Sequence, residues 1–376
     1  MLRNKVLLFF LAFLLIPGKL FADSPSLERM IGEMIMVGFR GMSLASDAPI
    51  LSALKSGKVG GVILFSRDSG AGRERNVNSM SQLQALTAQL RRAAGRPILI
   101  AVDQEGGKVQ RLGPNHGFPA WPTALELGRG NPDLTFQKAR QMGALLAQAG
   151  FNLNLAPSAD LHFADSPAIG KLERAFGAEP ELVAAHAANF IRAMSENKIL
   201  SCLKHFPGHG SARGDTHDGL TNAGPDWTPK ELAPFAILLE GGFSGAIMAA
   251  HVVLPQYGPL PADLNPAIIN GLLRSDLGWQ GVVISDDLQM KAIRNYYTLS
   301  ETILLAVEAG VDILIFGNNA TPSATGNFAE YDEQIAVNVH AELLELVRAG
   351  RVSQERIRQS WERIQIFKRS AEFGGI

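Results

Sequence analysis

Short apolar runs recur along the chain, and segments with helical patterns separate them. Most of these runs are continuously apolar rather than alternating, which is typical of strands buried on both faces, as in a parallel sheet. We predict eight strands, at residues 35–39, 61–65, 97–103, 151–157, 199–206, 245–251, 281–287 and 311–317. The alternation of strand and helix predicts an α/β fold.

The segments between the runs carry signals for helix starts and stops. In TPKELAPFAILLEGG, Thr228 is the predicted N-cap, Pro229 the first helical position, and Glu231 the residue that completes a capping box. The stretch SETILLAVEAG predicts a helix that begins at Ser300 and stops at Gly310. A helix, a glycine and a strand follow one another in LAQAGFNLNL, LLEGGFSGAIM and AVEAGVDILIF, which suits glycine in a left-handed cap.

Eight strand–helix units of this size predict a (β/α)8 TIM-type barrel, with a doubly wound sheet as the alternative. Residues after Asn318 have the pattern of a helical C-terminal tail. The sequence shows no linker or low-complexity tract, so we predict a single domain over residues 23–376.

The N-terminus differs in character from the rest of the chain. Arg3 and Lys5 precede an apolar run over residues 6–16, and Ala22 stands before an aspartate. This pattern predicts a secretory signal peptide over residues 1–22, and hence an exported protein, periplasmic or secreted. The apolar run is short for a transmembrane helix, and an uncleaved anchor is the alternative. We expect membrane contact only if the segment is not cleaved.

Composition narrows the classes of partner. The chain of 376 residues is 46% hydrophobic and 19% charged, as expected of a globular protein, and its formal net charge is -1. This balance gives no electrostatic reason to expect nucleic acid as a partner. The single cysteine, Cys202, can form no intramolecular disulfide, and we predict a small buried side chain there.

Polar side chains end several of the predicted strands. The carboxyl ends of the strands of such a barrel form its active site, so these groups are expected to converge. A buried polar group needs a partner, and a ligand can be that partner. The residues are Asp103, Lys204, His205, His251, Asp286 and Asp287.

The stretch KHFPGHGSARGDTHDG follows the fifth predicted strand. Asp215 lies two residues from His217 and could hold that imidazole in one tautomer, which makes a general acid/base near neutral pH. An exposed histidine without a role is one alternative. A zinc site of His205, His209, Asp215 and His217 is another, although the spacing fits no standard zinc pattern and Lys204 would add a positive charge.

Two further motifs end strands. The aspartates of SDDLQM could provide a nucleophile, a base or a metal ligand, or could cap the next helix. In VDQEGGKVQRL, Asp103 and Arg111 offer an acceptor and a fork of donors that suit the hydroxyls of a sugar, and the double glycine allows close approach of a ligand. The residues 103–105 could instead form a surface turn.

Six segments together resemble one known family. MIGEMIMVGFRG, VDQEGGKVQRL, ERAFG, KHFPGHG, GDTH and SDDLQM occur in the order found in the β-N-acetylhexosaminidases of glycoside hydrolase family 3, the NagZ type. The resemblance covers essentially the whole chain after the N-terminal segment, and it implies a (β/α)8 barrel. Two departures are the longer form AIGKLERAFG and Lys108, where arginine is usual.

The resemblance also implies roles for residues. Asp286 is expected to be the catalytic nucleophile and His217 the general acid/base, with Asp215 as its partner. A further set is expected to hold the N-acetylglucosamine ring, and it comprises Asp103, Arg111, Arg174, Lys204 and His205. No metal and no organic cofactor are implied.

The expected activity is a retaining exo-β-N-acetylglucosaminidase, acting through a covalent glycosyl-enzyme. The substrate would be a glycan that contains N-acetylglucosamine, either a peptidoglycan fragment or a chitin oligosaccharide. The alternatives are a β-glucosidase, a metal-dependent barrel hydrolase and a non-catalytic exported sugar-binding protein. Family members of this type are often cytoplasmic, whereas the N-terminal segment here predicts export.

Overall fold

The computed structural model describes residues 25–216, 219–224, 226–319 and 331–373, with side chains up to residue 370. Within this part of the chain, eight parallel strands close into a barrel in the order β1-β12-β11-β9-β7-β6-β3-β2. The strands are β1 Ile35–Gly38, β2 Gly61–Ile63, β3 Leu99–Val102, β6 Leu153–Asn154, β7 Leu200–Phe206, β9 Ala246–Ala249, β11 Val282–Asp287 and β12 Ile313–Phe316. The predicted barrel and its eight strands are therefore confirmed, and the doubly wound alternative is wrong.

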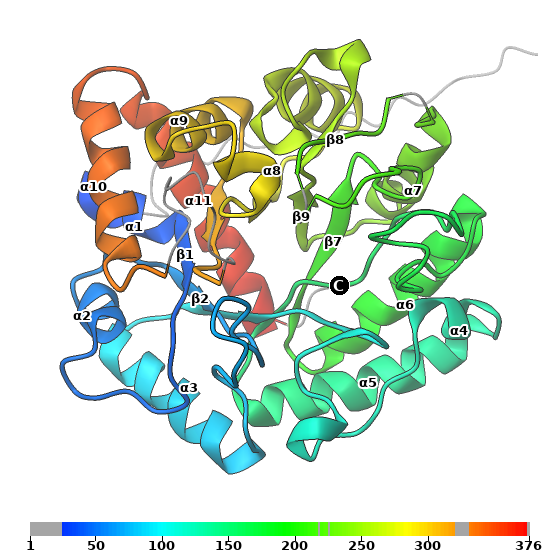
Figure 1. Ribbon diagram of the computed structural model, residues 1–376, viewed down its shortest axis with the longest axis horizontal. Helices are drawn as coiled ribbons and strands as arrows, with labels where there is room; N and C mark the ends of the chain where they lie inside the picture. The colour runs from blue at the N-terminus through cyan, green and yellow to red at the C-terminus, as the bar shows by residue number, and fades with distance from the viewer. Residues whose placement is uncertain (1–24, 217–218, 225, 320–330, 374–376) are drawn as a thin grey trace, which may run out of the picture.

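Helices surround the barrel (Figure 1). They are α1 Leu27–Glu33, α2 Pro49–Lys55, α3 Met80–Ala94, α4 Ala124–Gly128, α5 Pro132–Ala149, α6 Pro180–Glu196, α7 Ala233–Glu240, α8 Lys291–Arg294, α9 Leu299–Ala309, α10 Ile335–Arg348 and α11 Gln354–Phe373. A π-helical segment, Ala267–Asp276, lies between β9 and β11. Short loop strands are β4 Gln104–Gly106, β5 Val109–Gln110, β8 Thr221–Asn222 and β10 Val252–Val253.

The burial of the strands explains their composition. Every residue of β3 and of β7 is buried, because each strand has the barrel interior on one side and helices on the other. One large apolar core joins the barrel to the helical layer. Cys202 is part of that core, as predicted, and burial raises the pKa of its thiol.

All three predicted helix–glycine–strand joints contain a left-handed glycine, which after α7 is Gly242 with a φ of 84°. Gly150 and Gly310 end α5 and α9 in the left-handed conformation, with φ of 89° and 112°. Helix α9 has a capping box as well, but its N-cap is Thr298 and not Ser300.

The capping box predicted at Thr228 is wrong. A 3-10 turn, Pro229–Leu232, precedes α7, and the Thr228 side chain makes no cap hydrogen bond. The carboxylate of Glu231 instead accepts hydrogen bonds from Ser211, which lies in a distant loop. A tertiary contact has replaced the local one.

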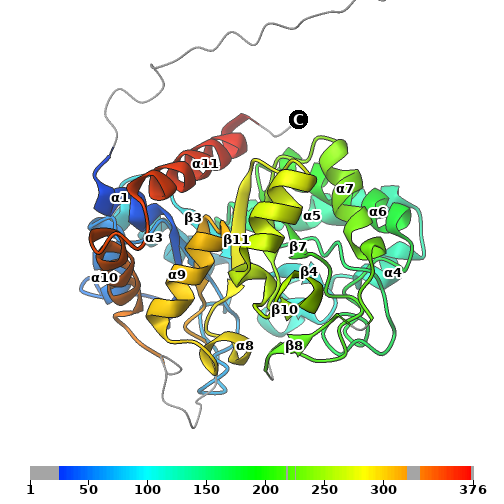
Figure 2. The same ribbon diagram turned by 90° about the horizontal axis from the view of Figure 1, so that it is seen from above.

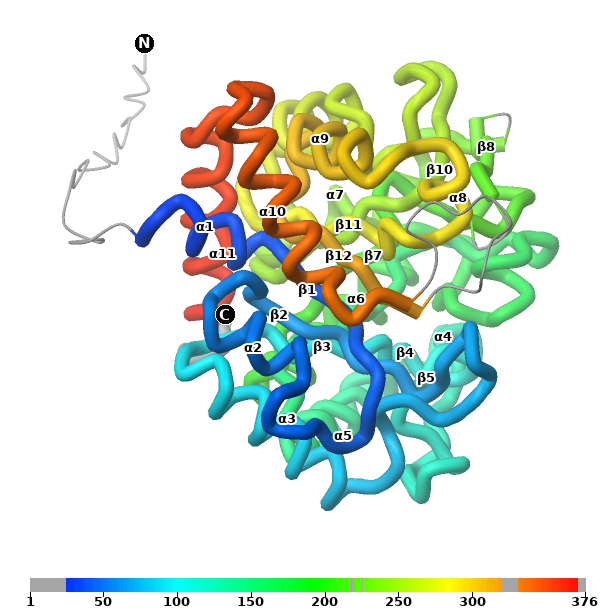
Figure 3. The backbone as a smooth tube through the Cα atoms, turned by 60° about the vertical axis from the view of Figure 1, so that its left-hand side comes forward, coloured from blue at the N-terminus to red at the C-terminus, as the bar shows by residue number. Residues whose placement is uncertain are grey.

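The predicted helical tail is confirmed as α10 and α11, which pack against α1 (Figure 3). The buried carboxylate of Asp312, at the start of β12, accepts hydrogen bonds from Ser360 and Arg363 of α11. Helix α11 lies at one end of the barrel, and α8 and β8 lie at the other (Figure 2). Helix α11 therefore covers the end of the barrel opposite to α8 and β8.

The predicted signal peptide, residues 1–22, lies outside the described residues. Among the described helices, none has both the length and the apolar character needed to cross a membrane.

Candidate active site

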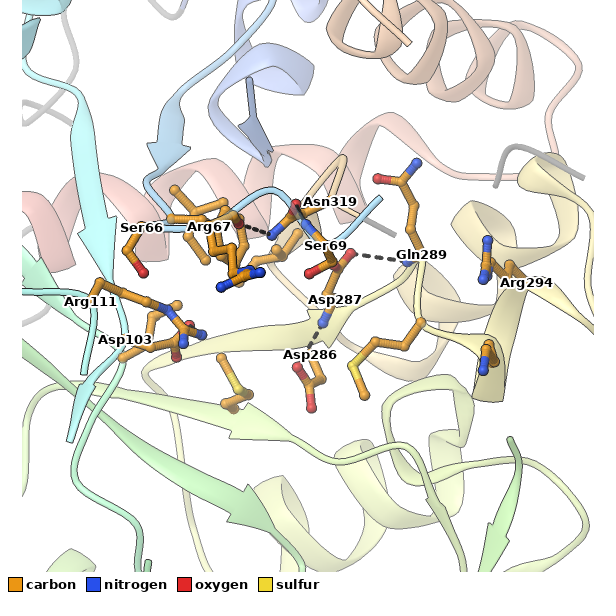
Figure 4. A pocket seen from close by; sticks show the side chains of 17 residues that line it. Ser66, Arg67, Ser69, Asp103, Arg111, Asp286, Asp287, Gln289, Arg294 and Asn319 are labelled. Atoms are coloured by element: carbon orange, nitrogen blue, oxygen red, sulfur yellow. Dashed lines mark hydrogen bonds and ion pairs between the residues drawn. The ribbon is translucent and has the colours of Figure 1, made fainter. Parts of the chain in front are cut away.

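A pocket of about 460 Å³ opens at the carboxyl ends of the strands (Figure 4). Side chains from the ends of β2, β3, β11 and β12 line it, so residues far apart in sequence meet there. Its polar lining includes Asp103, Arg111, Asp286, Asp287, Gln289 and Asn319. The predicted convergence of strand ends is confirmed for Asp103, Asp286 and Asp287, and Arg111, which was expected to act with Asp103, lines the same pocket.

The strands that carry the central residues are irregular at their ends. The pairing of β7 with β9 shifts register between Leu203 and Phe206. The pairing of β11 with β12 shifts between Ile284 and Asp287. Such irregularities turn side chains away from strict alternation, so consecutive polar residues can serve the same end of the barrel.

The two aspartates that end β11 have different surroundings. Oδ1 of Asp287 accepts hydrogen bonds from the backbone N–H groups of Gly317, at 2.8 Å, and Gln289, at 3.0 Å, which ties β11 to β12. Burial raises the pKa of Asp287. Asp286 accepts a hydrogen bond from the N–H of Asp287 at 2.8 Å and lines the pocket (Figure 4). The expected helix cap is wrong, because the N-cap of α8 is Met290 and no side chain caps that helix. Asp287 has a different structural role, which is to tie β11 to β12.

Lys204 lies behind the pocket, where its ammonium group joins two carboxylates. Its Nζ is 2.9 Å from Oδ1 of Asp103 and 2.7 Å from Oε1 of Glu105. Burial alone would lower the pKa of Lys204, but these two carboxylates raise it. Arg111 donates to the other oxygen of Asp103 at 3.1 Å. Against the effect of burial, Lys204 and Arg111 lower the pKa of Asp103, which is therefore ionised at neutral pH.

Arg174 reaches the same cluster in spite of the longer segment that precedes it. Its guanidinium forms two hydrogen bonds with Glu105, at 2.9 and 2.8 Å, and a third with Nε2 of His205 at 3.0 Å. Because a guanidinium only donates, Nε2 of His205 accepts, and Nδ1 donates to Asp160 at 2.7 Å. Both ring nitrogens are thus engaged, so His205 offers no nitrogen to the zinc site that the sequence left open.

Sequence reasoning missed Glu105 and Asp160. Glu105 was assigned to a possible surface turn, yet it is buried and pairs with Lys204 and Arg174. Asp160 is also fully buried and accepts from the backbone N–H groups of His205 and His209. A signal was present, because Asp160 is a polar residue only three residues after the apolar run at 151–157.

The loop after β7 runs from the barrel towards the end of β11. The backbone N–H of Ala292, in α8, donates to the carbonyl oxygen of Thr216 at 3.3 Å. Asp215 lies in this described stretch, and the next residue after Thr216 is His217, which lies outside the described residues. The acid/base role of His217 therefore stays a prediction.

His209 belongs to the same loop. Burial lowers the pKa of His209 to about 4, so its ring is neutral.

His251 forms a hydrogen bond with the backbone at the end of β11. Its Nδ1 is 2.8 Å from Oδ2 of Asp263, and its Nε2 donates to the carbonyl oxygen of Asp287 at 2.9 Å. Burial opposes protonation, but the carboxylate of Asp263 raises the pKa of His251 to about 9. The charged ring lies beside the Asp263 carboxylate, and its Nε2–H holds the backbone beside Asp286 in place.

Comparisons with known proteins agree with this geometry. Residues 26–367 match the sequence profile of the Glycosyl hydrolase family 3 N terminal domain. The chain is 38% identical over 271 residues to a beta-hexosaminidase from Nitrosomonas eutropha, covering 69% of this chain and 74% of the relative. It is 36% identical over 292 residues to a beta-hexosaminidase from Xylella fastidiosa, covering 75% of this chain and 82% of the relative.

Two solved structures are similar over most of the chain. One is a family 3 beta-N-acetylglucosaminidase from Paenibacillus, with a TM-score of 0.81 and 32% identity over 93% of this chain. This chain spans 63% of that protein. The other is a beta-N-acetylhexosaminidase from Beutenbergia cavernae, with a TM-score of 0.79, 30% identity, and coverage of 92% of this chain and 99% of that one.

Proposed function

Because the chain belongs to glycosyl hydrolase family 3 and is a glycoside hydrolase of the beta-hexosaminidase kind, we propose that it is a retaining exo-β-N-acetylglucosaminidase. It removes terminal N-acetylglucosamine through a covalent glycosyl-enzyme. The observation that carries this proposal is the pocket in which Asp286 of β11 lies with Asp103 and Arg111. A carboxylate nucleophile and a set of sugar-hydroxyl ligands thus share one cavity.

The proposed mechanism has two steps. The carboxylate of Asp286 attacks the anomeric carbon while His217, oriented by Asp215, protonates the leaving oxygen. His217 then takes a proton from water, which attacks the anomeric carbon and releases Asp286. Two inversions give net retention of configuration.

The sugar ring would be held by Asp103 and Arg111. Asp103 can accept from ring hydroxyls, since its pKa is lowered and it stays ionised. Lys204, Arg174 and His205 hold this pair in place. Lys204 pairs with Asp103 and Glu105, Arg174 also pairs with Glu105, and His205 accepts a hydrogen bond from Arg174. Fixing these donors and acceptors before the substrate binds lowers the cost of ordering the site.

A test of the proposed function is hydrolysis of 4-nitrophenyl β-N-acetylglucosaminide, with the anomer of the first product followed by NMR. We expect release of the β-anomer, and activity that survives exhaustive chelation. Initial release of the α-anomer would contradict a retaining mechanism. No hydrolysis at all would favour a sugar-binding protein, and loss of activity on chelation would favour the metal-dependent alternative.

For the natural substrate we propose a peptidoglycan fragment rather than a chitin oligosaccharide. Three cationic side chains, Arg67, Lys291 and Arg294, are among those that line the pocket. Positive charge there favours a leaving group that carries a carboxylate, as muramic acid does and N-acetylglucosamine does not.

This choice can be tested by the salt dependence of kcat/KM. We expect kcat/KM for N-acetylglucosaminyl-N-acetylmuramic acid to fall as salt screens the charges, and kcat/KM for chitobiose to change little. Lys291→Ala should reduce the first value and spare the second. Equal salt dependence for both substrates would favour a chitin oligosaccharide.

We also propose that the protein is exported after cleavage behind Ala22. The basic and apolar pattern of residues 3–16 supports this proposal. The test is the N-terminal sequence and intact mass of the protein recovered outside the cytoplasm. A mature chain that begins at Asp23 is expected, and an intact N-terminus in the membrane fraction would indicate an uncleaved anchor.

A further inference from the structure

Glu231 is a buried carboxyl group with no role in the mechanism described above. It lies on the 3-10 turn before α7, and its side chain is fully buried. Oε2 accepts a hydrogen bond from the backbone N–H of Ser211 at 3.2 Å, and Oε1 accepts from the hydroxyl of the same serine. Ser211 belongs to the loop after β7, four residues before Asp215.

The first part of this loop is fitted closely to its surroundings. The indole of Trp227 donates to the carbonyl oxygen of Pro207 at 3.1 Å, and the N–H of His209 donates to Asp160 at 2.8 Å. A Cβ on Gly208 would lie 2.6 Å from the Cβ of Glu231, and Gly208 has a φ of 114°. Only glycine therefore fits between this loop and Glu231.

The stretch from Ser211 to Thr216 is held at both ends. Glu231 binds Ser211, and the N–H of Ala292 binds the carbonyl oxygen of Thr216. Asp215 lies between these two points. The second contact is to α8, which follows the strand that carries Asp286, so the stretch bridges β7 and β11.

The charged groups around Glu231 leave its carboxyl without a cationic partner among those the structure records. Asp160 is a like charge, and the ring of His209 is neutral because burial lowers its pKa. Lys230, its neighbour in sequence, is exposed and pairs with Glu179. Burial accordingly raises the pKa of Glu231 to about 7. Either form can bond Ser211, since a protonated carboxyl accepts from the N–H and donates to the hydroxyl.

We propose that Glu231 is a positioning residue for proton transfer, which fixes Ser211 and thereby sets where the stretch from Ser211 to Thr216, with Asp215 in it, leaves the barrel. The inference rests on the proposed function, because it assigns proton transfer to that stretch. It predicts a defect confined to reactions in which the leaving group needs a proton. Formation of the glycosyl-enzyme at Asp286 from a substrate with an acidic leaving group is unaffected.

The experiment compares kcat/KM for chitobiose with kcat/KM for 2,4-dinitrophenyl β-N-acetylglucosaminide, whose leaving group needs no proton. We expect Glu231→Ala to lose roughly 10- to 100-fold on chitobiose, since a small displacement of a catalytic group costs that much, and to keep most of its rate on the aryl substrate. Glu231→Gln should restore chitobiose cleavage, because an amide can accept from the N–H of Ser211 and donate to its hydroxyl.

Arg213→Ala is the matched control in the same loop. Arg213 is exposed and pairs with Asp226, so we expect little change on either substrate. Ser211→Ala is the second variant if Glu231→Ala does not fold, and it should show the same selective loss to a smaller degree. Equal losses on both substrates, no loss on either, or no rescue by glutamine would overturn the proposal.

Failure of the proposed function would appear differently. In that case the wild-type protein would cleave neither substrate, and hydrogen exchange would supply the test of Glu231. Backbone amides of residues 207–216 should exchange faster in Glu231→Ala than in the wild type and in Glu231→Gln. Unchanged exchange in the alanine variant would overturn the positioning role.

Discussion

The ammonium group of Lys204 lies 2.9 Å from Oδ1 of Asp103, at the boundary between the barrel core and the candidate active site. Both groups are charged and largely withdrawn from water, and the lysine is only 2% exposed. Such a pair gains little net stability from its formation, but removal of one partner leaves an uncompensated charge. Lys204 therefore has a structural task as well as any contact with substrate.

We expect Lys204→Met to lower the free energy of unfolding by about 3–5 kcal/mol, because Asp103 and Glu105 would both lose their shared cation. The measurement is urea denaturation at neutral pH. Lys230→Met is the matched control, since Lys230 is exposed and pairs with Glu179, and its effect should stay within about 1 kcal/mol. Equal losses of unfolding free energy in the two variants would show that removing a cation from the buried pair costs no more than removing one from an exposed pair.

Removal of the Asp286 carboxylate should abolish the first chemical step. We expect Asp286→Ala to lose on the order of 10⁴-fold or more in kcat on every substrate, because the proposed covalent step uses this carboxylate as its nucleophile. Azide should restore part of the activity on an aryl glycoside and yield the α-glycosyl azide, by direct attack at the vacated face.

Asp287→Asn is the control for that experiment. The amide oxygen can still accept from Gly317 and Gln289, which bond to Oδ1 in the wild type. We expect this variant to retain turnover, and to need no azide. If Asp287→Asn were inactive and Asp286→Ala active, the nucleophile would have to be reassigned.

The sequence was sufficient for the barrel because its strands are buried on both faces. Continuous apolar runs such as LSCLKHF correspond directly to strands like β7, whose seven residues are all buried. Polar residues that end such runs, among them Asp103 and Asp286, could be assigned to the same end of the barrel, at the carboxyl ends of its strands, by the topology alone.

The hydrogen-bond partners of the buried charged residues could not be predicted in the same way. Glu105 and Arg174 are 69 residues apart, and their pairing depends on how the closed barrel brings two loops together. Glu231 shows the reverse problem, because its local pattern predicts a capping box, and only the tertiary contact with Ser211 reveals the actual bond. A local capping pattern does not predict the actual hydrogen bond when a buried donor elsewhere in the fold needs an acceptor.

Loss of the proposed acid/base should depend on the leaving group. We expect His217→Ala to reduce kcat/KM for chitobiose by roughly 10²- to 10⁴-fold, the usual range for general acid catalysis, and to spare the dinitrophenyl substrate. Asp215→Asn should give a smaller loss of the same kind. His116→Ala, at a histidine that pairs with Glu74 outside the pocket, should leave both rates near wild type. Equal losses on both substrates would contradict the assignment of His217.

The pair of His251 and Asp263 predicts how stability depends on pH. The folded pKa of His251 is about 9, above its ordinary value of roughly 6.5 in an unfolded chain. Its contribution is thus fully present below about pH 6.5 and is lost as the pH rises through 9. We expect the free energy of unfolding to fall by on the order of 3 kcal/mol across that window, measured by urea denaturation. His251→Gln should start from lower stability and show a flatter profile, and an unchanged slope in the variant would assign the pH dependence to other groups.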